Sequence, residues 1–204
     1  MSAYSILGLI LFVAWALLAG VGRMIVQRRR TGDSGFRFAT AAPGTVQWWA
    51  NRINAAGSVA VGVVGPVVEI LGPDPGASPF GSPVLRTAAL VVAAVGVACT
   101  YAAQLAMGTA WRIGVDPAER TTLVTSGPFA LVRNPIFTAA LITFAGLAMA
   151  SPNLVSLLGL GAVYAGIQMQ VRGVEEPHLL ATHGVTYAAY AARVGRFLPG
   201  IGRL

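Results

Sequence analysis

The chain has 204 residues, of which 55% are apolar and only 10% are charged, and its mean hydropathy is +0.70. Soluble domains carry about 25% charged residues, so this chain cannot cover a water-facing surface, and a soluble globular protein is excluded. All 14 basic residues are arginine and the net charge is +7, which would ordinarily suggest nucleic acid. Because these arginines stand beside long apolar segments, membrane topology explains the charge better, and we expect no nucleic-acid partner.

Five apolar segments predict membrane-spanning helices, at residues 5–22, 53–71, 84–107, 136–150 and 154–170. The first has 18 residues, about 27 Å of helix, which is just enough for a hydrocarbon core of about 30 Å. No basic stretch precedes it and no small-residue cleavage site follows it, so we predict a retained span and not a signal peptide. Trp48-Trp49 precede the second segment and suit the interface between membrane and water.

The fourth and fifth segments are separated only by Ser151-Pro152-Asn153, which predicts an antiparallel helical hairpin. The fourth segment is short for a free-standing span, so we expect protein neighbours on most of its sides. In the tail after Pro177, an apolar stripe that includes Leu179, Tyr187 and Val194 predicts a helix that lies on the membrane or caps the bundle.

The placement of arginine predicts the orientation of the chain. Thirteen of the 14 arginines fall in the first connection, the third connection or the tail, and only Arg86 lies near the other side. Because basic loops stay in the cytoplasm, we expect the N-terminus outside and the C-terminus inside. The predicted fold class is an all-α integral membrane protein, a single domain over residues 1–204. It has five transmembrane helices, a hairpin of spans four and five, and a C-terminal amphipathic helix.

Two groups of polar residues are not explained by topology. Arg133-Asn134-Pro135 stands where the fourth span begins, and Glu175-Glu176 stands where the fifth ends, with Arg172 one turn earlier. The hairpin returns both groups to one membrane face, so we expect them to be neighbours and to suit a zwitterionic ligand. The plainer alternatives are a topological anchor for the arginine, a helix start for the Asn-Pro pair, and a solvated helix end for the acids. The last alternative fits poorly, because two acids at a helix C-terminus oppose the macrodipole and Arg172 alone leaves one charge over.

Motifs in the second half of the chain resemble one family of membrane enzymes. The segments L-V-T-S-G-P-F at 123–129 and V-R-N-P-I-F at 132–137 are similar to G-P-Y/F … V-R-H-P-x-Y, a signature of the isoprenylcysteine carboxyl methyltransferase family. Three further segments are similar to the same family and its bacterial relatives: W-R-I-G-V-D at 111–116, E-E-P-H-L at 175–179 and R-F-L-P at 196–199. The resemblance covers about half of the chain. It implies a cofactor-binding catalytic region at 108–199 and a bacterial inner-membrane protein with a cytoplasmic active site.

The resemblance implies S-adenosylmethionine as the cofactor, held between short loops and the ends of the last membrane helices. In agreement, the sequence has no strand followed by the glycine-rich turn of a Rossmann domain. The implied binding residues are Arg133 or Arg112 for the carboxylate; Glu175 and Glu176 for the ammonium and ribose; Phe129, Phe137 and Leu180 for the adenine; and, around them, Gln104, Gly108, Gly127, Leu131, Val132, Asn134, Pro135 and Tyr187. The implied catalytic residues are Arg133, Glu176 and Arg172, and no metal is expected.

The chain departs from the family signature at two positions. Asn134 stands where the family has histidine, and Phe137 where it has tyrosine. Asparagine can donate and accept hydrogen bonds but cannot take up a proton at neutral pH, so position 134 can bind cofactor but cannot be a general base. The related phosphatidylethanolamine methyltransferases also have N-P-x-Y followed by E-E-P, which leaves oxygen, nitrogen and sulfur acceptors open.

We therefore expect methyl transfer to a lipophilic acceptor that enters from the bilayer, among membrane lipids; the oligomeric state is left open. A carboxylate acceptor is favoured, because opposite charges are neutralised in the transition state and no base is needed. An amine or phenol would need deprotonation, for which His178, His183, Tyr187, Glu175 and Glu176 are the candidates.

Two other functions remain as alternatives. An NADPH-dependent membrane reductase of the sterol reductase type could use Arg193 and Arg196 for the 2′-phosphate, but Glu175-Glu176 would repel the dinucleotide. A non-enzymatic membrane bundle for transport would need polar residues in the middle of its spans. Only Glu69 approaches that position.

Overall fold

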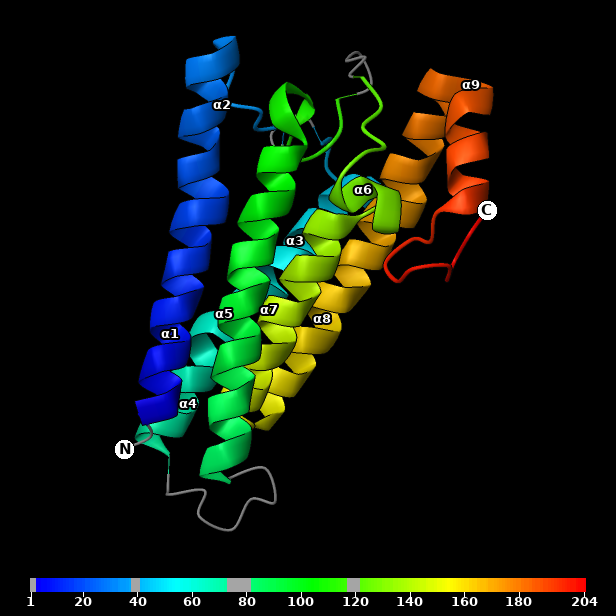
Figure 1. The fold of residues 1–204 in the computed structure, drawn as a ribbon. Coiled ribbons are helices and arrows are strands. Elements are labelled where there is room, and N and C mark those ends of the chain that lie inside the picture. The colour runs from blue at the N-terminus through cyan, green and yellow to red at the C-terminus, as the bar shows by residue number, and fades with distance from the viewer. Residues whose placement is uncertain (1–2, 38–40, 73–81, 117–121) are drawn as a thin grey trace.

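The computed structural model describes residues 3–37, 41–72, 82–116 and 122–204, and Figure 1 shows their fold. The first long helix consists of α1 (Ala3–Trp15), η1 (Ala16–Gly22) and α2 (Arg23–Thr31) without interruption. The prediction that it ends at residue 22 is wrong, because the arginines after that point continue the helix. The helix stops at Gly32, whose φ of 79° is the left-handed conformation that glycine adopts at helix ends.

The second long helix consists of α3 (Val46–Val59), η3 (Ala60–Val64) and α4 (Gly65–Leu71). It begins seven residues before the predicted start at residue 53, because the hydroxyl of Thr45 caps its first turn by accepting a hydrogen bond from the Trp48 amide. Trp48-Trp49 therefore lie on the helix and not before it.

The third and fourth predicted spans agree with the structure to within one residue. They are α5 (Pro83–Ala106) and α7 (Pro135–Ala150), each with a proline in its first turn. Two short helices, η4 (Gly108–Ala110) and α6 (Pro128–Leu131), lie between them. Arg120 and the chain at 73–81, where most of the second connection was predicted, lie outside the described residues.

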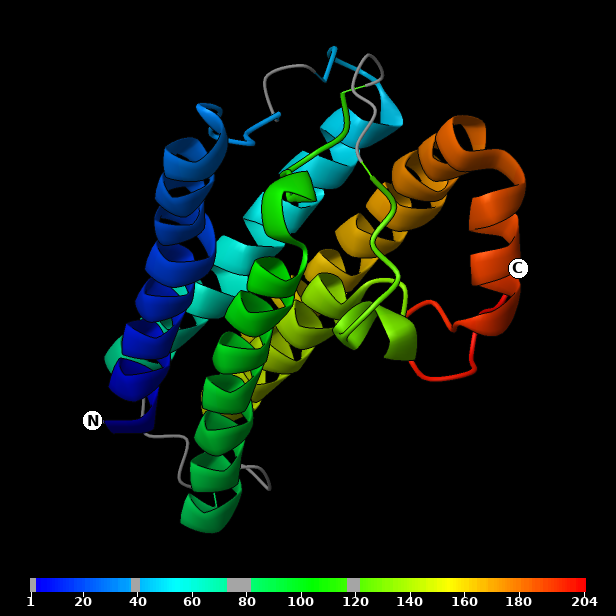
Figure 2. The same ribbon diagram turned by 45° about the horizontal axis from the view of Figure 1, so that its top comes forward.

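The predicted hairpin is confirmed, but its second helix is longer than expected. After the turn, α8 (Leu154–Gln170) continues through a π-helical turn, η5 (Val171–Glu175), into α9 (Glu176–Arg193). The prediction that a helix ends at Glu175-Glu176 is therefore wrong, and the macrodipole argument for these acids does not apply. Within α9, Gly184 has a φ of 52°, and the chain reverses so that the second half of α9 returns beside the first (Figures 1 and 2).

The described residues form an all-helical protein without a strand. Four helices are long and apolar enough to cross a membrane, Ala3–Thr31, Val46–Leu71, Pro83–Ala106 and Leu154–Arg193, and Pro135–Ala150 is a shorter apolar helix. Together they make a multi-span integral membrane protein.

Glycines bring the helices of the bundle into close contact. A Cβ atom at Gly96 of α5 would lie 2.6 Å from the backbone nitrogen of Thr143 on α7, and a Cβ at Gly57 of α3 would lie 2.7 Å from the carbonyl oxygen of Gly159 on α8. Backbones can approach this closely only where small residues face each other, which is the usual packing of membrane helices. The α5–α7 and α3–α8 pairs thus form the rigid centre of the bundle.

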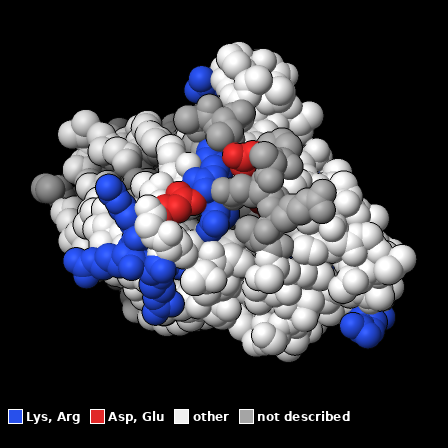
Figure 3. Space-filling view, turned by 90° about the horizontal axis from the view of Figure 1, so that it is seen from above, with Lys and Arg blue, Asp and Glu red and all other residues white. Residues whose placement is uncertain are grey.

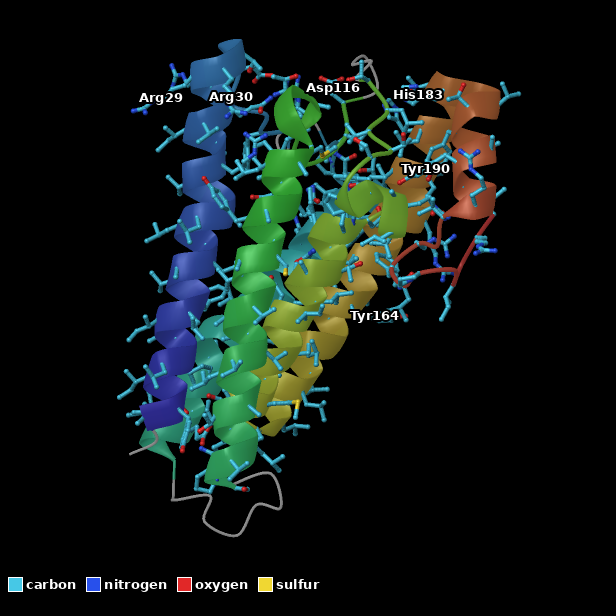
Figure 4. The ribbon with its side chains drawn as sticks, viewed as in Figure 1. Arg29, Arg30, Asp116, Tyr164, His183 and Tyr190 are labelled. Atoms are coloured by element: carbon cyan, nitrogen blue, oxygen red, sulfur yellow. The ribbon has the colours of Figure 1, made fainter. Side chains whose placement is uncertain are left out.

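The two ends of the bundle differ. One end, here called the loop end, carries the described parts of the connections that follow α2 and α5, together with the reversal of α9 (Figure 1). Arg29, Arg30, Asp116 and His183 all lie there (Figure 4). At the opposite end, Glu69 of α4 forms a buried ion pair with Arg86 of α5. Glu69 is therefore paired, which does not suit a transport path.

Candidate active site

The centre of the candidate site is a buried ion pair between Arg133 and Glu176. The Nη2 atom of Arg133 lies 2.7 Å from Oε1 of Glu176, and their side chains are only 2% and 8% exposed. Arg133 precedes α7 and Glu176 begins α9, so the hairpin of α7 and α8 brings the two together. The prediction that these two groups are neighbours is confirmed.

Arg196 is a second partner of Glu176 that the sequence analysis did not include in the site. Its Nε and Nη2 atoms lie 2.8 and 2.9 Å from the two carboxylate oxygens, which is the strong bidentate geometry of arginine and carboxylate. The hydrogen bonds to this carboxylate raise the pKa of Arg196 above its ordinary value. Arg172, the expected partner, is exposed, and its side chain has no described contact with this network.

Arg133 ties the start of α7 to the C-terminal segment. Its guanidinium donates hydrogen bonds to the carbonyl oxygens of Ala191, Val194 and Gly202 as well as to Glu176. Its two Nη atoms are therefore occupied by protein, while its Nε atom is buried without a partner among the described residues. A backbone hydrogen bond joins the same two segments, because the Arg133 amide donates to the Gly195 carbonyl at 2.8 Å.

Asn134 occupies the N-cap position of α7, but its side chain does not cap the helix. Its Nδ2 atom instead donates to the carbonyl oxygen of Arg196 at 3.2 Å, and its backbone amide donates to the same oxygen at 3.1 Å. The expected Pro135 is present at the first turn. Asn134 thus belongs to the contact between α7 and the C-terminal segment.

The second half of α9 caps the bundle. Tyr187 and Tyr190 are 1% and 4% exposed, and the hydroxyl of Tyr190 donates to the carbonyl oxygen of Phe129 at 2.6 Å. Val185, in contrast, is exposed. Of the two arrangements expected for the tail, this contact favours the capping one.

Glu175 has a very different environment from Glu176. Its carboxylate accepts a hydrogen bond from the side-chain amide of Gln170 at 3.2 Å. Among the described residues it has no ion pair, whereas Glu176 has two. Glu175 also lines the large cavity of the protein, so its carboxyl group is available to a ligand.

That cavity has a volume of about 630 Å³ and extends from the loop end into the bundle. Ligand pockets in proteins typically measure about 300–1,000 Å³. The predicted site residues that line it are Gln104, Arg112, Phe129, Arg133, Asn134, Pro135, Phe137, Glu175, Glu176 and Tyr187. The predicted residues that do not line it are Gly108, Gly127, Leu131, Val132, Arg172 and Leu180.

The first two long helices also line the cavity, which the sequence analysis did not predict. Trp15, Asn51 and Ser58 belong to its wall, together with Trp111 from the loop after α5. Trp111 opens the W-R-I-G-V-D motif, whereas no motif surrounds the other three positions, which only the packing of the helices brings to the cavity.

Charged side chains of both signs meet near the middle of the loop end (Figure 3). Arg112 lies 3.9 Å from Asp33 and donates hydrogen bonds to the carbonyl oxygens of Thr109 and Trp111. A hydrogen bond from Arg37 lowers the pKa of Asp33 to about 2, so Asp33 stays ionised at physiological pH. Arg112 is therefore a cavity-lining cation beside a fixed negative charge.

The cavity can satisfy the chemical groups of S-adenosylmethionine. Glu175 offers a carboxylate for its positive groups, and Phe129 and Phe137 offer apolar surface for its adenine. Buried polar atoms without a partner among the described residues occur on lining residues, including Nε of Arg133 and Oε1 of Gln170.

The fold and the cavity define an integral membrane protein with a cavity that is lined by charged residues at one end. The family model for phospholipid methyltransferases matches residues 84–185, which is half of the chain, and the chain belongs to this family. No curated protein and no solved structure matches it. The phospholipid methyltransferases belong with the isoprenylcysteine-type membrane methyltransferases, so the resemblance inferred from the motifs is confirmed.

Membership establishes the class of reaction. The protein is a membrane methyltransferase that uses S-adenosylmethionine and acts on a lipid acceptor. The reductase and the non-enzymatic bundle are thereby set aside.

Proposed function

We propose that S-adenosylmethionine binds at the loop end of the cavity, with Glu175 as the acceptor for its positively charged groups. The observation that carries this proposal is that Glu175 borders the cavity with an amide partner but no cation among the described residues. A buried carboxylate without a counter-charge is costly. The ammonium of the cofactor would supply the missing positive charge.

Arg112 is the proposed partner of the cofactor's carboxylate. Of the two arginines expected for this role, Arg133 uses both Nη atoms for contacts within the protein. Arg112 lines the cavity and its side chain is 21% exposed, so a ligand can reach it. The position of Arg112 on the cavity wall and its partly exposed side chain support this choice.

We assign a positioning role to Arg133, Glu176 and Arg196. Their network joins the start of α7, the start of α9 and the C-terminal segment, and each of these elements supplies or supports part of the cavity wall. When bound, the cofactor supplies a methyl group on a positively charged sulfur. Methyl transfer depends mainly on the alignment of donor and acceptor, so the network would contribute by keeping the cavity wall in place.

The proposed arrangement is one membrane domain over residues 1–204, with five spans and the cofactor-binding region at 108–199. The loop end faces the cytoplasm of a bacterial inner membrane and the N-terminus lies outside. This orientation is supported by the 13 of 14 arginines that fall on the cytoplasmic side of the assignment.

Calorimetry with S-adenosylhomocysteine tests the cofactor site. We expect the parent protein to bind it with a dissociation constant in the micromolar range, or about −8 kcal/mol, and to bind NADPH negligibly. Glu175→Gln should weaken binding about tenfold or more, because a charge-assisted hydrogen bond contributes about 1.5–3 kcal/mol. Arg172→Gln is the control, since Arg172 is exposed and does not line the cavity. Equal affinity of the Glu175→Gln variant and the parent would remove Glu175 from the site.

A further inference from the structure

The cavity opens to the side of the bundle between the first helix and α3. Val21 on η1 and Val59 on α3 both line the cavity, yet they are 52% and 49% exposed. The first helix packs against η3 and α4 at the end of the bundle away from the loops, and the two long helices diverge toward the loop end (Figures 1 and 2). We call the gap that these two valines border the side opening. Because both helices are candidate membrane spans, the side opening faces the bilayer.

Arg52 stands on α3 at the edge of the side opening. It precedes Val59 by seven residues, so it lies on nearly the same side of α3 and about 10 Å nearer the loop end. Its side chain is exposed, and its guanidinium lies over the ring of Trp48, 3.9 Å from the ring centroid. Within the described part of the chain, Arg52 has no acidic partner and donates no side-chain hydrogen bond. Its donors are therefore available to an anion.

The other side of the side opening also carries an arginine. Arg28 follows Val21 by seven residues and Met24 by four, so it lies on the side of the first helix that these two lining residues share. Its side chain is exposed and has no acidic partner among the described residues. A cation thus stands on each of the two helices, toward the loop end from the opening. Trp48 beside Arg52 suits the level of the lipid headgroups.

We propose that the acceptor lipid enters through the side opening and that Arg52 binds the phosphate of its headgroup there, with Arg28 adding positive potential from the other side. Guanidinium donors match the oxygens of a phosphate, and contact with Trp48 reduces the freedom that the arginine loses on binding. Arg28, Trp48 and Arg52 lie outside the residues that match the family model, so membership of the family does not assign them. That the bound lipid is methylated rests on the proposed function; its binding at Arg52 does not.

The cavity behind the side opening also contains a proton acceptor for the reaction. His178, at the start of α9, lines the same cavity and is half-buried. When an amine or hydroxyl of the headgroup is methylated, the acceptor atom forms a bond to the methyl carbon, and the electron pair of the methyl–sulfur bond goes to sulfur. The acceptor atom then releases one proton, which a neutral imidazole can take up.

Lipid binding tests the role of Arg52. The purified protein, in detergent micelles and without cofactor, binds radiolabelled dioleoyl phosphatidylethanolamine, a zwitterion that is not attracted unspecifically to a protein of net charge +7. Unlabelled phosphatidylethanolamine is compared as competitor with dioleoylglycerol, which lacks the phosphate. We expect the phospholipid to compete about fivefold better or more, which is the affinity that one arginine contributes near a membrane surface. Equal competition by the two lipids would overturn the proposal.

Variants of Arg52 show whether the preference arises at this residue. Arg52→Gln should weaken phosphatidylethanolamine binding about fivefold and leave dioleoylglycerol binding unchanged. Arg52→Lys should fall between the parent and Arg52→Gln, because lysine keeps the charge but not the planar donors. Arg30→Gln is the matched control, since Arg30 is also exposed but lies on a different side of its helix from Arg28. Because Arg52 is exposed, thermal unfolding should be unchanged, and parent-like phospholipid binding by Arg52→Gln would overturn the proposal.

A bulky side chain tests the entrance itself. Val59→Trp narrows the side opening and should weaken the binding of both lipids several-fold. Val68→Trp is the control, because Val68 is exposed on the same long helix but does not line the cavity. Unchanged lipid binding by Val59→Trp would show that the lipid enters elsewhere.

S-adenosylhomocysteine binding separates this proposal from the proposed function. If S-adenosylhomocysteine binds to the parent and to Arg52→Gln alike but the two lipids compete equally, the proposal for the side opening fails alone. If the phospholipid is preferred through Arg52 and S-adenosylhomocysteine does not bind, the cofactor site proposed at Glu175 fails alone.

Discussion

Glu175 and Glu176 are adjacent in the chain, yet their carboxylates have different partners. Both oxygens of Glu176 are bound by arginine, at 2.7 to 2.9 Å, whereas Glu175 accepts one hydrogen bond from the amide of Gln170. The boundary between the two residues is also a change of helix type, because the π-helical turn η5 ends at Glu175 and α9 begins at Glu176. Both acids line the cavity, but only Glu176 is paired with arginine among the described residues.

Because the two acids have different partners, replacing each of them with glutamine should have different effects on the stability of the protein. Glu176→Gln leaves Arg133 and Arg196 without their carboxylate partner, and removing one member of a buried ion pair costs about 3–5 kcal/mol. We expect its thermal unfolding midpoint in detergent to fall by several degrees, while that of Glu175→Gln changes little. Arg133→Ala should be as unstable as Glu176→Gln.

The double variant Arg133→Ala/Glu176→Gln provides the control for this pair. Because the two residues contact each other, their effects on stability should be far less than additive. A full sum of the two single effects would show that the pair does not act as a unit.

Much of the fold could be predicted from the sequence, because apolar length and turn residues determine where spans lie. The bounds of α5, α7 and the hairpin follow from uninterrupted apolar segments and from Ser151-Pro152-Asn153. At the helix ends the prediction was wrong where it took charged residues as the end of a helix. Arg28 and Glu176 look like exits from a membrane, yet the backbone stays helical through both.

The site could be predicted only in part, because some of its residues meet only through the packing of segments that are distant in the sequence. The hairpin determines the meeting of Arg133 and Glu176, so the sequence is sufficient there. The position of Arg196 depends on the reversal of the chain at Gly184, which the spacing of apolar residues does not predict. The cavity wall that the first two long helices supply depends on how whole helices pack, so Trp15 and Asn51 have no local signature.

Position 134 should accept histidine better than alanine. The Asn134 side chain donates one hydrogen bond to the Arg196 carbonyl, and histidine, the residue of the isoprenylcysteine-type signature at this position, can donate a similar bond. We expect Asn134→Ala to lose about 0.5–1.5 kcal/mol of stability and Asn134→His to lose less. Chemical unfolding in mixed micelles measures both, and greater stability of the alanine variant would exclude a role for this bond.

Cysteine labelling in intact cells tests the orientation. In a Cys99→Ala background, Ser82→Cys stands at the start of α5 and Thr182→Cys on α9, at opposite ends of the bundle. A membrane-impermeant maleimide should label the first and not the second, because the loop end is expected in the cytoplasm. Lysed cells serve as the control in which both are accessible. Labelling of Thr182→Cys alone would reverse the proposed orientation.

Arg23 lies outside the residues that match the family model, yet we expect it to stabilise the wall of the cavity. Its guanidinium donates to the carbonyl oxygens of Gln104 and Gly108, and Gln27 adds a bond of 2.8 Å to the Thr109 carbonyl. These contacts fasten the segment before Trp111, which lines the cavity, to the first helix. Arg23→Met keeps the apolar length of the side chain but removes its donors. We therefore expect lower stability, by about 1–3 kcal/mol, and several-fold weaker binding of S-adenosylhomocysteine.

Arg23→Lys and Arg30→Met complete that test. Lysine keeps the charge but loses the planar stack over Trp111, so Arg23→Lys should fall between the parent and Arg23→Met in both measurements. Arg30 is exposed on the same helix, so Arg30→Met should resemble the parent. If Arg23→Met loses stability but binds S-adenosylhomocysteine like the parent, Arg23 supports the fold and not the cavity wall. The first helix would then contribute to the site only through its side chains that line the cavity.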